Sequence, residues 1–217
     1  MTTDFGEIGR LALATGGVVS LDARAVQASV AVTEKAGPGD WARPTPCGDW
    51  TLDQLLAHMT RQHDGFAAAA AGNGADPAAW RPRPPAADPV TEYVAAAGRV
   101  LAAFAADGVL DRDFALPEID PAATFPAALA ISFHFIDYVV HGWDVARTLG
   151  LDYQVEPDLL GVALAVGRAV PDDDRTRRRP GAAFAPPVSA PEGASPVDQV
   201  VAQLGRPPGW AADWSAG

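Results

Sequence analysis

The sequence contains a single cysteine, Cys47, among its 217 residues. One thiol cannot form a disulfide within the chain, so cystine cross-links play no part in the fold. No apolar run approaches the roughly 18 residues of a membrane helix, and the amino-terminal residues lack a basic stretch followed by an apolar run and a cleavage site. We therefore expect a cytoplasmic protein that does not enter a membrane.

Basic residues are scarce as well. The chain has 16 Lys and Arg against 27 Asp and Glu, which gives a formal net charge of −11 at pH 7. Such a surface repels phosphate groups, which argues against nucleic acids and anionic membranes as partners. The basic run at 175–179 follows three aspartates at 172–174 and is interpreted as a balanced, solvated loop. A small-molecule substrate is the partner class that we expect.

Motifs for nucleotide and iron–sulfur chemistry are also missing. The chain has no G-x-G-x-x-G, phosphate-binding loop, G-x-S-x-G or Cys-x-x-Cys pattern. Nucleotide and Fe–S chemistry therefore have no support in the sequence.

Apolar residues make up 48% of the chain and recur at helical spacing in several segments. Long helices are predicted at about 20–36, 51–72, 90–106 and 126–149, and shorter helices at about 157–169 and 196–204. The pattern Thr51-x-x-Gln54 predicts a capping box at the start of the second helix, and Gly150 predicts the end of the fourth. No long segment alternates as a strand does.

These elements predict an all-α protein built as a four-helix bundle. We assign residues 18–150 to the bundle, residues 1–17 to a leader segment, and residues 151–217 to an extension of helix and irregular chain packed on the bundle. Whether two chains pair as a homodimer stays open.

All four histidines fall on the second and fourth predicted long helices, where facing side chains meet inside a bundle. They are His58, His63, His134 and His141. Asp137 lies four residues before His141, so the two side chains share one face of their helix. With a histidine from another helix, they offer two nitrogens and one oxygen, a donor set typical of a catalytic zinc site that also suits nickel, iron or manganese.

The alternative is an ordinary core: a buried histidine is often just hydrogen-bonded, and Asp137 and His141 would then form a simple charge pair. His134, seven residues before His141, is either a core histidine or a pocket residue, and it is our candidate catalytic group for proton handling. His63 points about 140° away from His58 around their helix, so we expect it at the surface or the edge of the bundle.

Two further residues are weighed near these helices. Cys47 precedes the second helix, where the helix dipole would favour a thiolate nucleophile, but packing is the simpler role. Asp144, three residues after His141, is predicted to orient a ligand or to bind Arg206.

Three blocks of sequence resemble a known family. They are PTPCGDWTLDQLLAHM (44–59), DYVVHGWDVARTLG (137–150) and LGRPPGW (204–210), and they occur in the same order as in that family. Together they resemble the mycothiol-dependent maleylpyruvate isomerase N-terminal-domain family of the DinB-like superfamily, and within it an actinobacterial branch that shares the G-R-x-P-x-W ending.

The resemblance implies a four-helix bundle that holds a divalent metal, commonly zinc, near one end. The family's metal ligands carry over onto His58, Asp137 and His141, and mycothiol or a similar thiol is the implied cosubstrate. Aspartate stands at 137 where the isomerase type has glutamate, so we expect the metal to sit differently. The implied function is a thiol-dependent isomerase or S-transferase acting on a small electrophile, and the alternative is a metal- or ligand-binding protein without turnover.

Overall fold

The structure is a computed structural model that describes residues 17–81, 87–179 and 181–211. The described chain is mostly helical, in agreement with the all-α prediction. Its long helices are α2 (Val18–Thr33), α3 (Leu52–Ala70), α4 (Pro89–Phe104) and α5 (Ala127–Leu149). The shorter elements are η1 (Pro77–Trp80), η2 (Val109–Asp111), β1 (Asp113–Ala115), β2 (Thr124–Pro126), α6 (Pro157–Ala169), α7 (Asp174–Arg177) and α8 (Pro196–Gln203). The predicted leader lies outside the described residues except for Gly17.

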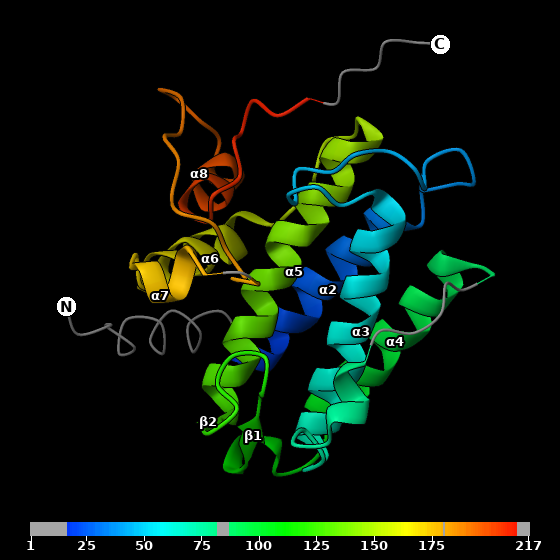
Figure 1. The fold of residues 1–217 in the computed structure, drawn as a ribbon, viewed down its shortest axis with the longest axis vertical. Coiled ribbons are helices and arrows are strands. Elements are labelled where there is room, and N and C mark those ends of the chain that lie inside the picture. Colours follow the sequence, from blue (N-terminus) through cyan, green and yellow to red (C-terminus); the bar gives the residue numbers. More distant parts are fainter. Residues whose placement is uncertain (1–16, 82–86, 180, 212–217) are drawn as a thin grey trace.

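Helix α5 runs through the middle of the molecule (Figure 1). Helix α2 packs along α5, and α3 packs along α4 and also contacts α5. Because α5 has neighbours on several sides, it buries residues over most of its surface, as expected for a helix that is apolar nearly all round. Among the described helices, none combines the length and the apolar character that a membrane span needs.

The helix ends follow local signals in the sequence. The Thr51 hydroxyl accepts from the Gln54 backbone N–H at 3.4 Å, and the Gln54 side chain accepts from the Thr51 N–H at 3.0 Å. This capping box starts α3 as predicted and aligns the helix that carries His58 and His63. Helix α5 ends at Gly150, whose φ of 69° is favourable only for glycine.

A small antiparallel hairpin was not predicted. Strands β1 and β2 pair with Phe114 opposite Phe125 in the loop before α5. Each strand has three residues, too few to show an alternating pattern, so only the contact between the two segments reveals the hairpin.

The carboxy-terminal part packs on α5. Leu159 of α6 and Val200 of α8 are buried in the same core cluster as Trp143 of α5. The solvated-loop interpretation of the basic run is wrong for Arg177, which is only 2% exposed. Its guanidinium donates to the carbonyl of Val170, at the end of α6, and to that of Ala185. Backbone carbonyls at a helix end need donors, and Arg177 supplies them.

Candidate metal centre

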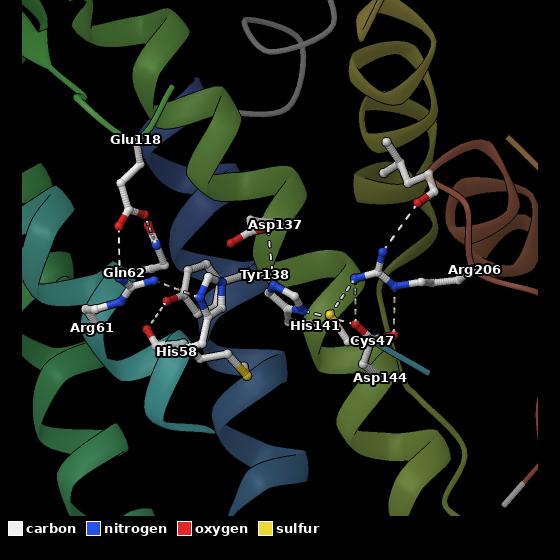
Figure 2. Close-up of polar contacts among 12 residues, drawn as sticks. Cys47, His58, Arg61, Gln62, Glu118, Asp137, Tyr138, His141, Asp144 and Arg206 are labelled. Carbon is white, nitrogen blue, oxygen red and sulfur yellow. Dashed lines mark hydrogen bonds and ion pairs between the residues drawn. The ribbon is translucent and has the colours of Figure 1, made fainter. Parts of the chain in front are cut away.

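Three predicted ligands lie together between α3 and α5. His58, Asp137 and His141, which we call the outer group, each offer one donor atom, and these atoms lie within 4.8 Å of one another. His141 Nε2 is 3.3 Å from Asp137 Oδ1, one helical turn earlier, and the rings of His58 and His141 are 5.3 Å apart. The sequence spacing therefore correctly placed Asp137 and His141 on one face, and tertiary packing brings His58 to them (Figure 2).

The outer group is buried on one side only. His141 is 2% exposed, whereas His58 and Asp137 are half-buried. Two of the three residues are therefore partly accessible to solvent, while the third is held inside the protein.

The second nitrogen of His141 is fixed by a carboxylate. His141 Nδ1 lies 3.0 Å from Asp144 Oδ2, and Asp144 is fully buried. Arg206 donates to both oxygens of Asp144, from Nε and from Nη2, at 3.3 Å each. The predicted contact between Asp144 and Arg206 is confirmed. Asp144 also orients the His141 ring so that Nε2 faces Asp137.

Cys47 belongs to these surroundings, which sequence reasoning missed. Its sulfur accepts from Arg206 Nη2 at 3.0 Å, and Cys47, His141 and Asp144 form a second group of donors within 4.8 Å. The guanidinium of Arg206 already contacts Cys47 and Asp144, so a cation there meets a positive charge. No motif links Cys47 to His141, because their contact depends on how the loop before α3 folds against α5.

The charges at the outer group shift its two histidines in opposite directions. Burial alone would lower the pKa of His141, but the facing Asp137 carboxylate, the Asp144 hydrogen bond and Cys47 outweigh burial and raise the pKa well above its usual range. Burial, together with the charges of His141, Arg61 and Arg206, lowers the pKa of His58 well below its usual range. His58 is thus neutral, whereas His141 would have to release a proton before it could bind a metal.

Arg61 competes for His58. Its Nη2 donates to His58 Nδ1 at 3.2 Å, and its Nη1 donates to Glu118 Oε1 at 2.8 Å (Figure 2). A metal at Nδ1 displaces this donor, and a metal at Nε2 puts the ring proton on Nδ1, which ends the same bond. Arg61 would therefore have to leave His58 for a metal to bind there. Trp50 covers another part of His58, with ring centroids 4.7 Å apart.

The other two histidines form a separate, sealed cluster with an aspartate of α2. His134 Nδ1 is 2.6 Å from Asp22 Oδ1, and His134 Nε2 is 3.1 Å from His63 Nδ1. All three residues of this inner group, Asp22, His63 and His134, are 0% exposed. The Tyr138 ring stacks on His63 at 4.0 Å, and Phe104 meets His134 edge-on.

The expectation that His63 lies at the surface is wrong. The 140° turn from His58 directs His63 into the core because α3 contacts α4 as well as α5 and so buries two faces. Asp22 was not singled out, since a lone aspartate on this helix carries no motif. His134, the predicted catalytic group, points to Asp22 and His63 and is not a member of the outer group.

The outer group fits a divalent metal better than the inner one. It offers two nitrogens and a carboxylate oxygen at close range, an oriented histidine, and a side reached by solvent. Three protein ligands with one open position are typical of catalytic sites for zinc and similar metals. The structure brings the three predicted ligands together, and their role as metal ligands stays a prediction.

Comparisons with known proteins identify two similar sequences. Two proteins of Mycobacterium tuberculosis, uncharacterized protein Rv0738 (strain ATCC 25618 / H37Rv) and uncharacterized protein MT0763 (strain CDC 1551 / Oshkosh), are each 31% identical to this chain. Each match runs over 188 residues and covers 84% of this chain and 94% of the relative.

A solved structure has the same fold. The crystal structure of the mycothiol-dependent maleylpyruvate isomerase matches with a TM-score of 0.52 at 10% sequence identity, covering 74% of this chain and 69% of that chain. The sequence model of the mycothiol maleylpyruvate isomerase N-terminal domain matches residues 23–146, which include all three residues of the outer group. The chain therefore belongs to the mycothiol maleylpyruvate isomerase N-terminal-domain family.

Proposed function

We propose that the protein is a divalent-metal-dependent enzyme that joins a low-molecular-weight thiol to a small electrophilic substrate. The observation that carries the proposal is the outer group: three convergent donors, one of them buried and oriented, with two half-buried toward solvent. Membership of the family supports a thiol such as mycothiol as the cosubstrate.

Zinc suits the donor set best, and nickel, iron and manganese also accept two imidazoles and a carboxylate. When bound, the metal supplies a Lewis acid that lowers the pKa of a thiol and polarises a carbonyl. The chain's own residues do the rest. Asp137 and the two histidines hold the ion, and Asp144 keeps the His141 ring in the binding orientation.

The thiol chemistry allows two outcomes. Addition of the thiolate sulfur to a conjugated double bond forms a C–S bond and leaves a C–C single bond that rotates. Expulsion of the same thiolate then restores the double bond, and the net reaction is a cis–trans isomerisation. If a proton is taken up at carbon instead, the conjugate persists and the protein is an S-transferase.

His134 keeps its proposed part in proton handling, but its surroundings restrict how it acts. The ring is fully buried between Asp22 and His63, so it would act through these two partners and would not touch a substrate. The test is the pH profile of turnover by a His134→Gln variant, provided that it remains folded. An unchanged profile would remove His134 from the reaction.

Metal content of tag-free protein is the first test. We expect about one zinc or similar ion per chain in the wild type and a loss of the ion in His58→Ala and His141→Ala. His63→Gln is the matched control, because it alters a histidine on the same helix that lies outside the outer group. A wild type that stays metal-free after incubation with zinc and with nickel would contradict the proposal.

Turnover is the second test. The metal-loaded protein is incubated with a thiol and an activated alkene, and both loss of free thiol and change of alkene geometry are followed. Either change, absent in His141→Ala, supports the enzyme. A protein that binds metal but changes neither across thiols and electrophiles is a metal-binding protein without turnover.

A further inference from the structure

We propose that Arg206 is a positioning residue for the metal ligand His141 and acts on it through Asp144. This inference rests on the proposed function, because it concerns the same site. It extends the site beyond residues 23–146, the part of the chain matched by the family's sequence model.

The turn after α8 brings Arg206 to the site. The Arg206 N–H donates to the Val201 carbonyl at 2.9 Å, and the Gly205 N–H donates to that of Ala202 at 3.1 Å, which is the Schellman pattern of a helix end. Gly205 has a φ of 82°, and a Cβ there would lie 2.6 Å from the Cβ of Ala185. Only glycine fits both constraints, so the turn fixes the path of Arg206 toward α5.

Arg206 binds Asp144 through two donors at once, a geometry that only the guanidinium of arginine provides. Nε donates to Oδ1 and Nη2 donates to Oδ2, so two donors of one planar group meet the two oxygens of one carboxylate. Arg206 is 5% exposed and Asp144 is 0% exposed. A lysine would bring the charge but only one donor head, which cannot fix the plane of the carboxylate.

The carboxylate of Asp144, held by Arg206, fixes the orientation of the His141 ring. Asp144 Oδ2 accepts from Arg206 and lies 3.0 Å from His141 Nδ1, while Nε2 of the same ring points to Asp137 (Figure 2). Residues that hydrogen-bond to a metal ligand typically contribute 10–100-fold in metal affinity, because they fix the ligand's orientation. The carboxy-terminal segment therefore completes the metal site without contributing a ligand.

A second ion pair joins the same parts of the molecule and provides the control. Arg147 of α5 pairs with Asp198 of α8 at 3.4 Å, but its side chain is 37% exposed. It ties α8 to α5 as Arg206 does, yet its partner is Asp198 and not the carboxylate that holds His141. Loss of Arg147 therefore tests whether mere docking of this segment matters.

The experiment measures cobalt and zinc affinity of the full-length protein by competition with a chromophoric chelator, together with the visible spectrum of the cobalt form. Arg206→Met should lower affinity about 10–100-fold and alter the cobalt spectrum at saturation. Arg206→Lys should recover only part of the loss. Arg147→Met should stay within about twofold of the wild type, because exposed ion pairs contribute little. Circular dichroism checks that each variant is folded.

A double-mutant cycle with Asp144→Asn sharpens the test. If Arg206 acts through Asp144, the two losses are far from additive. Additive losses, a full recovery by Arg206→Lys, or equal losses in Arg147→Met and Arg206→Met would each overturn the inference while leaving the metal site intact. A wild type that binds neither cobalt nor zinc would overturn the proposed function and this inference together.

Discussion

The outer and inner groups draw histidines from the same two helices but surround them differently. In the outer group, the rings of His58 and His141 lie 5.3 Å apart beside Asp137. In the inner group, the rings of His63 and His134 lie 5.2 Å apart beside Asp22. Residue types and spacing are therefore nearly equal in the two groups.

Orientation and access separate the groups. In the outer group the donor atoms converge on one point and two residues are half-buried, so an ion can enter. In the inner group three of the four ring nitrogens are used in a chain from Asp22 through His134 to His63. The fourth, His63 Nε2, is buried without a hydrogen-bond partner, and aromatic rings seal the cluster. Histidine and aspartate become ligands only where their free lone pairs point to a common, reachable position.

The largest expected effect is the loss of stability when the inner carboxylate is removed. Asp22→Ala leaves a buried ring nitrogen of His134 without its partner, so we expect a cost of about 3 kcal/mol in the free energy of unfolding. Urea denaturation measures it. Asp22→Asn keeps an acceptor and should cost less. Metal content should not change, and a loss as large as that of Asp137→Ala would show that the two groups are not independent.

Asp137→Ala tests the outer group, where we expect a loss of metal affinity and little loss of stability. It removes a proposed metal ligand, so zinc affinity should fall by about 100-fold or more, which exceeds the contribution of a residue that only hydrogen-bonds to a ligand. The metal-free protein should lose less than about 1 kcal/mol, because Asp137 is half-buried. Chelator competition and urea denaturation give the two numbers. Asp137→Glu, the residue of the isomerase type, should keep measurable binding, and a failure to bind would mean that side-chain length is critical here.

The pH dependence of the metal-free protein separates His63 from His141. Burial, and the charges of His134 and Arg99, lower the pKa of His63 in the fold, so its contribution to stability is present above the unfolded value of about 6.5 and is lost as the pH falls. His141 has a raised pKa, so its contribution is present at low pH and is lost as the pH rises through its folded value. His63→Gln should therefore reduce the acid destabilisation, by up to about 2 kcal/mol at pH 5.

Urea midpoints between pH 5 and 8 measure this difference in chelated protein. Equal pH slopes for the wild type and His63→Gln would contradict the buried neutral state of His63. Zinc affinity should instead rise with pH in both proteins, because His141 releases a proton when the ion binds.

The smallest expected effect is a gain. Arg61→Met removes the donor that occupies His58 and a positive charge near the ion, so zinc affinity should rise about threefold, the scale of a partly exposed pair. Arg99→Met is the matched control, because Arg99 of α4 pairs with Asp64 of α3, the helix that carries His58, and not with His58 itself. A drop in affinity for Arg61→Met would show that Arg61 supports the bound state.

Much of the fold was predictable from local signals. The capping box at Thr51, the stop at Gly150 and the apolar spacing depend on neighbours within one or two turns, so they can be recognised without knowing any tertiary contact. The three-residue strands were missed because each is too short to show an alternating pattern. His63 was misplaced because the sequence does not tell how many neighbours a helix has.

The sequence by itself determined that Asp137 and His141 share a face, since four residues make about one helical turn. It also determined the types of the donor atoms and the family to which the chain belongs. Only the tertiary structure decided that His58 joins this pair while His63 joins His134, and that Cys47 and Arg206 meet beside His141. Helical spacing is a property of one segment, whereas the choice of partners depends on how separate segments pack, and that packing follows from the burial of the whole core.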